Sequence, residues 1–144
     1  MEEQIMSTFA GRLSLAFGAG CLGGLVNSIV VWFLGDAGLP ARLGVQLAPD
    51  FTLAWLYPRI VWGGLWGGLL LLPIASRSHL LRGLIASLAP SAFMLLWLLP
   101  SAGKGLFGTG MGWLTPAFVL VYNAVWGIAA GFWFALASGQ TRRL

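Results

Sequence analysis

Residues 58–72 read PRIVWGGLWGGLLLL, an arginine followed by an unbroken run of apolar residues and glycines. The apolar character continues on both sides, so that the run extends over residues 51–74. A bilayer core about 30 Å thick is crossed by a helix of roughly 20 mostly apolar residues. Residues 51–74 are therefore predicted to form a membrane-spanning helix.

Three further apolar runs have a similar character, at residues 13–34, 83–99 and 114–138. The chain of 144 residues is 58% hydrophobic and 8% charged, with a mean hydropathy of +0.86. Soluble domains carry roughly 25% charged residues, and transmembrane β-barrels need alternating strands rather than continuous apolar runs. The prediction is an all-α, four-helix transmembrane bundle that forms a single domain over residues 1–144.

Basic residues are distributed unequally between the two ends of the predicted helices. Five lie on the side of the N-terminus, the middle loop and the C-terminus, and two lie in the opposite loops. The five are Arg12, Arg77, Arg82, Arg142 and Arg143, and the two are Arg42 and Lys104. Because loops rich in Lys and Arg stay in the cytoplasm, we predict a multi-pass protein of the plasma (inner) membrane with both termini cytoplasmic.

A short motif occurs twice, once in the second predicted helix and once in the fourth. Residues 59–67 read RIVWGGLWG and residues 123–131 read NAVWGIAAG, so both follow the pattern polar-x-Val-Trp-Gly-x-x-x-Gly. A repeat unit of two helices keeps its direction in the membrane, which makes the repeat a parallel one. The match predicts a parallel 2+2 internal repeat, and chance similarity between glycine-rich helices is the alternative.

Glycines spaced four residues apart mark one face of three predicted helices. The pairs are Gly20 with Gly24, Gly63 with Gly67, and Gly127 with Gly131. Lipid gives helices no hydrophobic drive to associate, and small residues let their backbones approach closely. These faces are predicted to pack helices together, either within the chain or in a homo-oligomer or larger membrane complex.

Three polar residues interrupt the apolar runs at a similar distance from the outer ends of their helices: Asn27, Arg59 and Asn123. Each lies about eight residues from that end, or roughly 12 Å at 1.5 Å per residue. Helical spacing also places each of them on the glycine face of its helix. Tyr57 and Tyr122 lie near the same level, so we predict that all five residues form a polar binding cluster in the outer leaflet.

Arg59 is the one charged residue inside a predicted span, and the chain contains only four acids, Glu2, Glu3, Asp36 and Asp50. A charge in the membrane needs a partner, which is here an acid of the outer loop, the neighbouring amides and carbonyls, or a bound anion. The guanidinium is planar and always charged, which suits phosphate or carboxylate oxygens. In the alternative interpretation the helix begins two residues before Arg59, which then reaches the lipid headgroups as a structural anchor.

The residue types that metal sites and hydrolytic sites need are scarce. The chain has one His and one Cys, and no acid lies within a predicted span. We therefore expect no metal, no cofactor and no enzymatic activity, and so few basic residues argue against a nucleic-acid partner.

Two functional hypotheses remain. The first is a non-enzymatic membrane protein whose polar cluster binds or passes a small anion or an anionic lipid headgroup, with membrane lipids as partners. The alternative is a structural or accessory membrane subunit, in which the glycine faces and the polar cluster serve helix packing and assembly.

Overall fold

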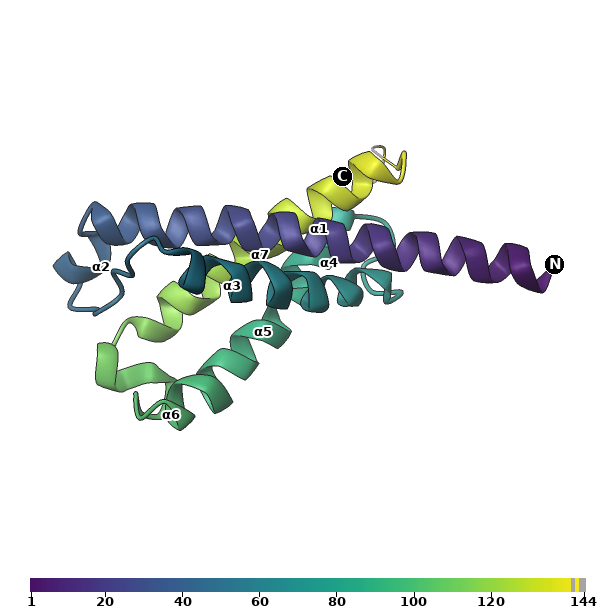
Figure 1. The fold of residues 1–144 in the computed structure, drawn as a ribbon. Helices are drawn as coiled ribbons and strands as arrows, with labels where there is room; N and C mark the ends of the chain where they lie inside the picture. The colour runs from purple at the N-terminus through teal and green to yellow at the C-terminus, as the bar shows by residue number, and fades with distance from the viewer. Residues whose placement is uncertain (141, 143–144) are drawn as a thin grey trace.

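The computed structural model of the protein describes residues 1–140 and 142, apart from the side chains of residues 2–7, and the regular structure in this part of the chain is all helical. No β-strand occurs in that part of the chain. Two long antiparallel helices, α1 and α7, run along the molecule, and shorter helical pieces pack against them (Figure 1). The elements in chain order are α1 (Glu2–Asp36), α2 (Leu39–Arg42), α3 (Leu53–Gly67), η1 (Gly68–Leu71), α4 (His79–Ala86), α5 (Leu88–Phe93), η2 (Met94–Leu98), α6 (Leu99–Ser101), η3 (Leu106–Met111) and α7 (Thr115–Ala137).

Three helical segments of the described residues are long and apolar enough to cross a membrane. They are Thr8–Asp36 within α1, His79–Ser101, which contains α4 to α6, and Thr115–Ala137, which is α7. Three of the four predicted runs are therefore confirmed as helical segments of spanning length, and the chain has the makeup of a membrane protein. The remaining predicted run, residues 51–74, forms a shorter helix than predicted. Its helix α3 has 15 residues and continues only as the four-residue 3₁₀ turn η1.

Helix α3 begins and ends where its sequence favours a boundary. The Trp55 backbone N–H donates a hydrogen bond of 3.2 Å to Thr52 Oγ1, so that Thr52 acts as the N-cap. After η1 the backbone becomes extended at Leu72, directly before Pro73, which disfavours a helical residue ahead of it. Arg59 is consequently the seventh residue of α3, so the helix begins six residues before Arg59 and not two. That Arg59 reaches the lipid headgroups as a structural anchor stays a prediction.

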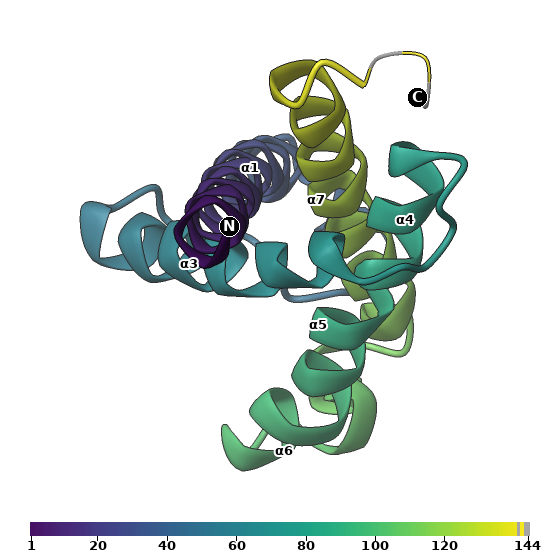
Figure 2. The ribbon, with the colours of Figure 1, turned by 90° about the vertical axis from the view of Figure 1, so that its right-hand side faces the viewer.

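The third apolar run is a series of short helical pieces rather than one regular helix. It is interrupted at Ser87, between α4 and α5, where Pro90 has no N–H to donate to the Ala86 carbonyl four residues earlier. Further along, Met94–Leu98 adopt the wider π-helical turn of η2, just ahead of Pro100. Figure 2 shows α5 and α6 diverging from α1, so this segment leaves the centre of the molecule.

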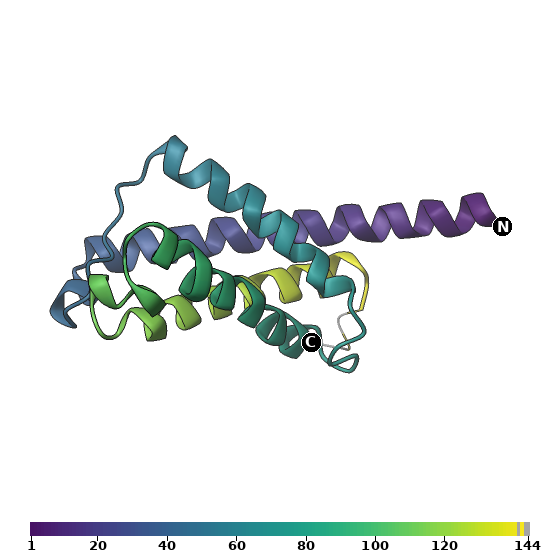
Figure 3. The same ribbon diagram turned by 90° about the horizontal axis from the view of Figure 1, so that it is seen from below.

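The first glycine face brings α1 and α3 together. A Cβ added to Gly63 would lie 2.7 Å from the Gly20 carbonyl oxygen and 2.9 Å from Gly24 Cα. A Cβ on Gly67 would lie 3.0 Å from Gly20 Cα. The two backbones are thus in direct contact, and Figure 3 shows α3 crossing α1 obliquely.

The second glycine face packs α7 against α4. A Cβ on Gly127 would overlap the Gly83 carbonyl group, and a Cβ on Gly131 would overlap the His79 carbonyl group. As in the first pair, any side chain at these positions would push two backbones apart. The predicted glycine positions therefore lie at two separate helix contacts within one chain.

Buried apolar residues form two clusters, one at the middle of α1 and one toward its C-terminal end. On α1, one cluster contains Ala16 and Ala19, and the other contains Val31. Asn27 lies between the two clusters along α1, and Asn123 is on the part of α7 that contacts it. This polar layer is where the candidate site lies.

Candidate functional site

Arg59 is held by neutral groups of α1 and of its own helix. Its Nε donates to Ser28 Oγ at 2.9 Å, and its Nη2 donates to Asn27 Oδ1 at 2.7 Å. The guanidinium carbon lies 4.7 Å from the centre of the Trp55 ring, within the range of a cation–π interaction. None of these contacts neutralises the positive charge of Arg59.

The partners of Arg59 are themselves fixed by the backbone. Asn27 Nδ2 donates to the Tyr122 carbonyl oxygen at 2.6 Å, and Ser28 Oγ donates to the Gly24 carbonyl oxygen at 2.7 Å. Asn27 is 5% exposed and Ser28 is fully buried. Residues of α1 therefore connect α3 to α7 through side-chain hydrogen bonds, in a layer where an unpaired polar group would be costly.

Asn123 makes a contact of the same kind between α7 and α5. Its Nδ2 donates to Ser91 Oγ at 3.1 Å, and Ser91 Oγ donates to the Ser87 carbonyl oxygen at 2.8 Å. In both cases a polar side chain donates to a serine, which donates to the carbonyl four residues before it. The spacing along the chain from Ser28 to Ser91 is nearly the same as the spacing from Arg59 to Asn123.

A cavity of about 340 Å³ lies beside this polar layer, and we call it the side groove. Asn27, Arg59 and Asn123 supply its polar lining. The remaining lining is dominated by apolar and aromatic side chains of α3 on one side and of α5 and η2 on the other. The side groove is thus an apolar space with a single positive charge on its wall.

Aromatic rings face one another across the side groove. The Phe93 ring on α5 lies 6.0 Å from the Trp62 ring and 5.8 Å from the Trp66 ring, both on α3. At its rim, Trp62 is 51% exposed and Leu98 of η2 is 44% exposed. The side groove therefore opens on the outside of the molecule between α3 and η2.

A second, smaller cavity of about 130 Å³ lies on the other side of the polar layer, and we call it the outer pocket. It shares Asn27, Arg59 and Asn123 with the side groove, so Arg59 borders both spaces. Leu47 and Met111, which belong to the segments that precede α3 and α7, also line it. The outer pocket thus extends from Arg59 toward the segments that precede α3 and α7.

Arg59 has donor groups that the protein does not use. A guanidinium carries five N–H donors, and the hydrogen bonds of Arg59 use Nε and Nη2. Within residues 1–140 and 142, Nη1 donates to no protein acceptor. Because the side chain borders both cavities, these N–H groups are available to an anionic oxygen from a ligand.

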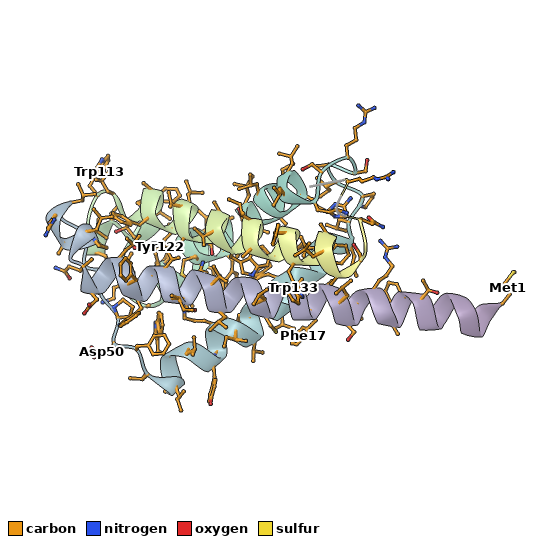
Figure 4. The ribbon with its side chains drawn as sticks, turned by 90° about the horizontal axis from the view of Figure 1, so that it is seen from above. Met1, Phe17, Asp50, Trp113, Tyr122 and Trp133 are labelled. Atoms are coloured by element: carbon orange, nitrogen blue, oxygen red, sulfur yellow. The ribbon has the colours of Figure 1, made fainter. Side chains whose placement is uncertain are left out.

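The acidic side chains that the structure describes do not contribute to the site. Asp36 and Asp50 are exposed, and Figure 4 shows Asp50 on the linker that precedes α3. Among the residues that the structure describes, no three His, Cys, Asp or Glu side chains gather into a metal-binding group. The chemistry that the cluster offers is hydrogen-bond donation from a fixed cation.

Comparison of the chain with protein-family models, with curated proteins and with solved structures finds no match. The site is therefore interpreted from its own geometry.

The structure brings together four of the five residues predicted for the binding cluster. Asn27, Arg59 and Asn123 line both cavities, and Tyr122 lines the outer pocket. Tyr57 is 58% exposed and lines neither of these cavities. Of the predicted cluster, Tyr57 is the residue that the structure places elsewhere.

Sequence reasoning missed Ser28, Ser91 and Trp55, which contact the cluster directly. A signal for the serines was present in the sequence. Ser28 precedes Arg59 by 31 residues, and Ser91 precedes Asn123 by 32 residues. Comparing the first and third runs at one residue less than the spacing between Arg59 and Asn123 would have paired the two serines.

Proposed function

We propose that this chain is a non-enzymatic integral membrane protein that binds an anionic lipid, with the lipid headgroup on Arg59 and its apolar chains along the side groove. One observation carries the proposal. Arg59 borders a largely apolar cavity that opens at the side of the bundle, and it keeps N–H donors unpaired there. A buried or half-buried cation without a protein anion attracts an anion from outside the chain.

The lining of the side groove favours an amphiphile over a small free anion. A hydrated anion gains nothing from contact with Trp62, Trp66 and Phe93, whereas lipid chains bury apolar surface against such residues. The exposed rim faces the region that lipid occupies around a membrane protein. An anionic lipid satisfies the charge of Arg59 and the apolar walls at the same time.

The parallel 2+2 repeat is part of this proposal, and the helix contacts support it. Gly67 packs on Ala16 in the same way as Gly131 packs on His79. The number of residues from Gly67 to Gly131 is nearly the same as the number from Ala16 to His79. Gly63 likewise contacts Gly20, and Gly127 contacts Gly83, so this second pair of contacts is shifted along the chain by nearly the same number of residues. Ligand sites of membrane proteins built from repeats lie at the interface between the repeats, which is where the polar layer lines both cavities.

The two sides of such a repeat differ in one respect that matters for entry of a lipid. On one side, α1 and α7 pack directly, and Trp126 Nε1 donates to the Gly20 carbonyl oxygen at 3.1 Å. On the opposite side, Trp62 and Trp66 of α3 contact Phe93 of α5, and the side groove lies beside these rings, between α3 and η2. The open side supports entry of the ligand from the surrounding bilayer rather than from water.

The proposal also includes a fourth membrane crossing, formed by α3 and η1 together. They give a continuous helical stretch from Leu53 to Leu71, about 28 Å at 1.5 Å per residue. At its end, Arg82 donates to the carbonyl oxygens of Leu70 and Ile74 at 3.1 and 2.8 Å, which compensates for lost helical hydrogen bonds. With the bias of basic residues, four crossings place both termini in the cytoplasm of a plasma-membrane protein.

Labelling of single cysteines tests this topology. In a Cys21→Ala background, Gln46→Cys is expected to react with a membrane-impermeant maleimide in intact cells, because residue 46 belongs to an outer loop. Ser76→Cys, which is exposed in the inner loop, is expected to react only after permeabilisation. Labelling of both positions from the same side would show that α3 does not cross the membrane.

One observation favours the structural alternative, in which the chain is an accessory subunit of a homo-oligomer or of a larger membrane complex. Asn27 and Ser28 use the polar cluster to join three helices, so the cluster contributes to packing without any ligand. In that case Arg59 serves the assembly alone. Native mass spectrometry separates the two candidates.

The protein is purified in a mild detergent from membranes that contain phosphatidylethanolamine and phosphatidylglycerol. We expect an anionic phospholipid to remain bound, enriched over phosphatidylethanolamine relative to the composition of the membrane. A protein that retains no lipid, or that retains both lipids in membrane proportions, would refute lipid binding and favour the structural alternative.

A further inference from the structure

Asn123 carries a hydrogen-bond acceptor that no described residue uses. Its Nδ2 donates to Ser91 Oγ, and Ser91 Oγ donates to the Ser87 carbonyl oxygen. Because a carbonyl oxygen can only accept, the hydroxyl proton of Ser91 is committed to it, and the Asn123 amide must turn its nitrogen toward Ser91. Asn123 Oδ1 is the atom left over. It accepts no hydrogen bond within the described part of the chain, and it is not sealed off by protein atoms.

Arg59 and Asn123 border the same space. Both side chains line the side groove and the outer pocket. Asn27 connects them, because it accepts from Arg59 Nη2 and donates to the carbonyl oxygen of Tyr122, the residue directly before Asn123. A ligand that is held by Arg59 therefore meets Asn123 within the same cavities.

The two side chains offer opposite halves of a hydrogen bond. A guanidinium carries donors and no acceptor, whereas the free atom of Asn123 is an acceptor. Both residues occupy the first position of the motif found at residues 59–67 and 123–131. A lipid that fills this space excludes water from Asn123 Oδ1. Its headgroup must then supply a donor of its own, since an acceptor left unpaired in a water-free site lowers the affinity.

The charge of Arg59 limits which donor suits Asn123. An ammonium group is a donor, but it would lie close to the guanidinium and be repelled by it, which disfavours an ethanolamine headgroup. A hydroxyl is a neutral donor and avoids this repulsion. A headgroup that combines an anionic phosphate with a nearby hydroxyl satisfies both residues.

We propose that Arg59 and Asn123 form a two-point headgroup site, in which Arg59 binds the phosphate of an anionic phospholipid and Asn123 Oδ1 accepts a hydrogen bond from a headgroup hydroxyl. The ligand class is an anionic phospholipid with a hydroxylated headgroup, such as the glycerol of phosphatidylglycerol. Asn123 determines this specificity, because Arg59 recognises the phosphate alone. The inference rests on the lipid binding proposed above and names the headgroup.

A comparison of two lipids tests the site in the wild-type protein. Phosphatidylglycerol and phosphatidylethanol with the same acyl chains carry the same charge, but phosphatidylethanol has no hydroxyl on its headgroup. Lipid titration in native mass spectrometry is expected to show about threefold to tenfold tighter binding of phosphatidylglycerol, as one hydrogen bond implies. Equal affinities would overturn the two-point site and leave anionic-lipid binding intact. Binding of neither lipid would refute the proposed function itself.

Asn123→Leu assigns the preference to Oδ1, because it removes the amide and keeps a side chain of similar size. The variant is expected to bind phosphatidylglycerol only as tightly as phosphatidylethanol, whose affinity stays at the wild-type value. Ser91 loses its contact with Asn123 but still donates to the Ser87 carbonyl oxygen. The measured quantity is therefore the ratio of the two affinities, and an unchanged ratio would overturn the role of Asn123, even if both affinities fall together.

Gln46→Leu is the matched control. It also replaces a side-chain amide by leucine, but Gln46 is exposed and lines neither cavity. This variant should keep the wild-type preference for phosphatidylglycerol over phosphatidylethanol. A loss of the preference in Gln46→Leu equal to that in Asn123→Leu would contradict a specific contact with Asn123. The wild-type comparison decides the proposal by itself if Asn123→Leu does not fold.

Discussion

Replacing Arg59 by leucine is expected to lower the affinity for phosphatidylglycerol at least about tenfold and to abolish the preference for anionic over zwitterionic lipids. A hydrogen bond to a charged group contributes about 1.5–3 kcal/mol, and each 1.4 kcal/mol corresponds to about a tenfold change in affinity. Leucine keeps an apolar wall on the side groove, so contacts with the lipid chains persist. Lipid titration in native mass spectrometry measures both affinities.

The substitution leaves Asn27 Oδ1 without its donor, at a cost of about 1–3 kcal/mol, while the other contacts of the cluster persist. Without Arg59, Asn27 still donates to the Tyr122 carbonyl oxygen and Ser28 still donates to the Gly24 carbonyl oxygen. Arg42→Leu is the matched control, since Arg42 is exposed on α2 and lies outside both cavities. Arg59→Leu with a wild-type preference for phosphatidylglycerol, or an equal loss in Arg42→Leu, would contradict a specific role for Arg59.

Replacing Gly127 by alanine is expected to destabilise the protein by about 1–3 kcal/mol, the usual cost of forcing a methyl group into a packed contact. A Cβ at this position would overlap the Gly83 carbonyl group, which is backbone and has no rotamer to change. Helices α4 and α7 would have to separate over the whole contact. Thermal unfolding in detergent measures the loss.

Gly18→Ala is the control for this substitution. Gly18 also lies within a long helix, but a Cβ there would have no neighbour within 4 Å. Alanine favours the helix over glycine by about 1 kcal/mol, so this variant should be as stable as the wild type or more stable. If Gly127→Ala unfolds at the same temperature as Gly18→Ala, the close α4–α7 contact is refuted.

The glycine contacts were largely predictable from the sequence. A spacing of four residues places the glycines on one helix face, and in lipid such a face lets two helix backbones approach closely. The partner helices were not predictable in the same way. Gly127 and Gly131 meet Gly83 and His79, and nothing in the local pattern of α4 marks His79 as a backbone contact of a glycine.

The convergence of Asn27, Arg59 and Asn123 also followed from helix geometry, but the prediction for Tyr57 did not. Each residue turns a helix by about 100°, so Tyr57, two residues before Arg59, points about 200° away from it. Tyr122 directly precedes Asn123 and lies only about 100° away, and it lines the outer pocket. The prediction grouped the two tyrosines with the cluster by their depth in the membrane. It did not consider the direction in which each side chain leaves its helix, and this direction differs between them.

The two cavities could not have been predicted from the sequence. They depend on how α5 and η2 diverge from α3, which follows from the interruption at Ser87 and the π-helical turn of Met94–Leu98. Pro90 and Pro100 signal that the third run is irregular, but they do not give the direction in which it bends. Side-chain spacing along one helix contains no information on such a tertiary opening.

The position of the bound lipid is measured by photo-crosslinking with phosphatidylglycerol that carries a diazirine in its acyl chain, followed by peptide mapping. Lipid binding in the side groove predicts crosslinks at Trp62, Phe93 and Met94, which disappear in Arg59→Leu. Crosslinks spread evenly over the exposed faces of α1 and α7, or groove crosslinks that persist in Arg59→Leu, would contradict it.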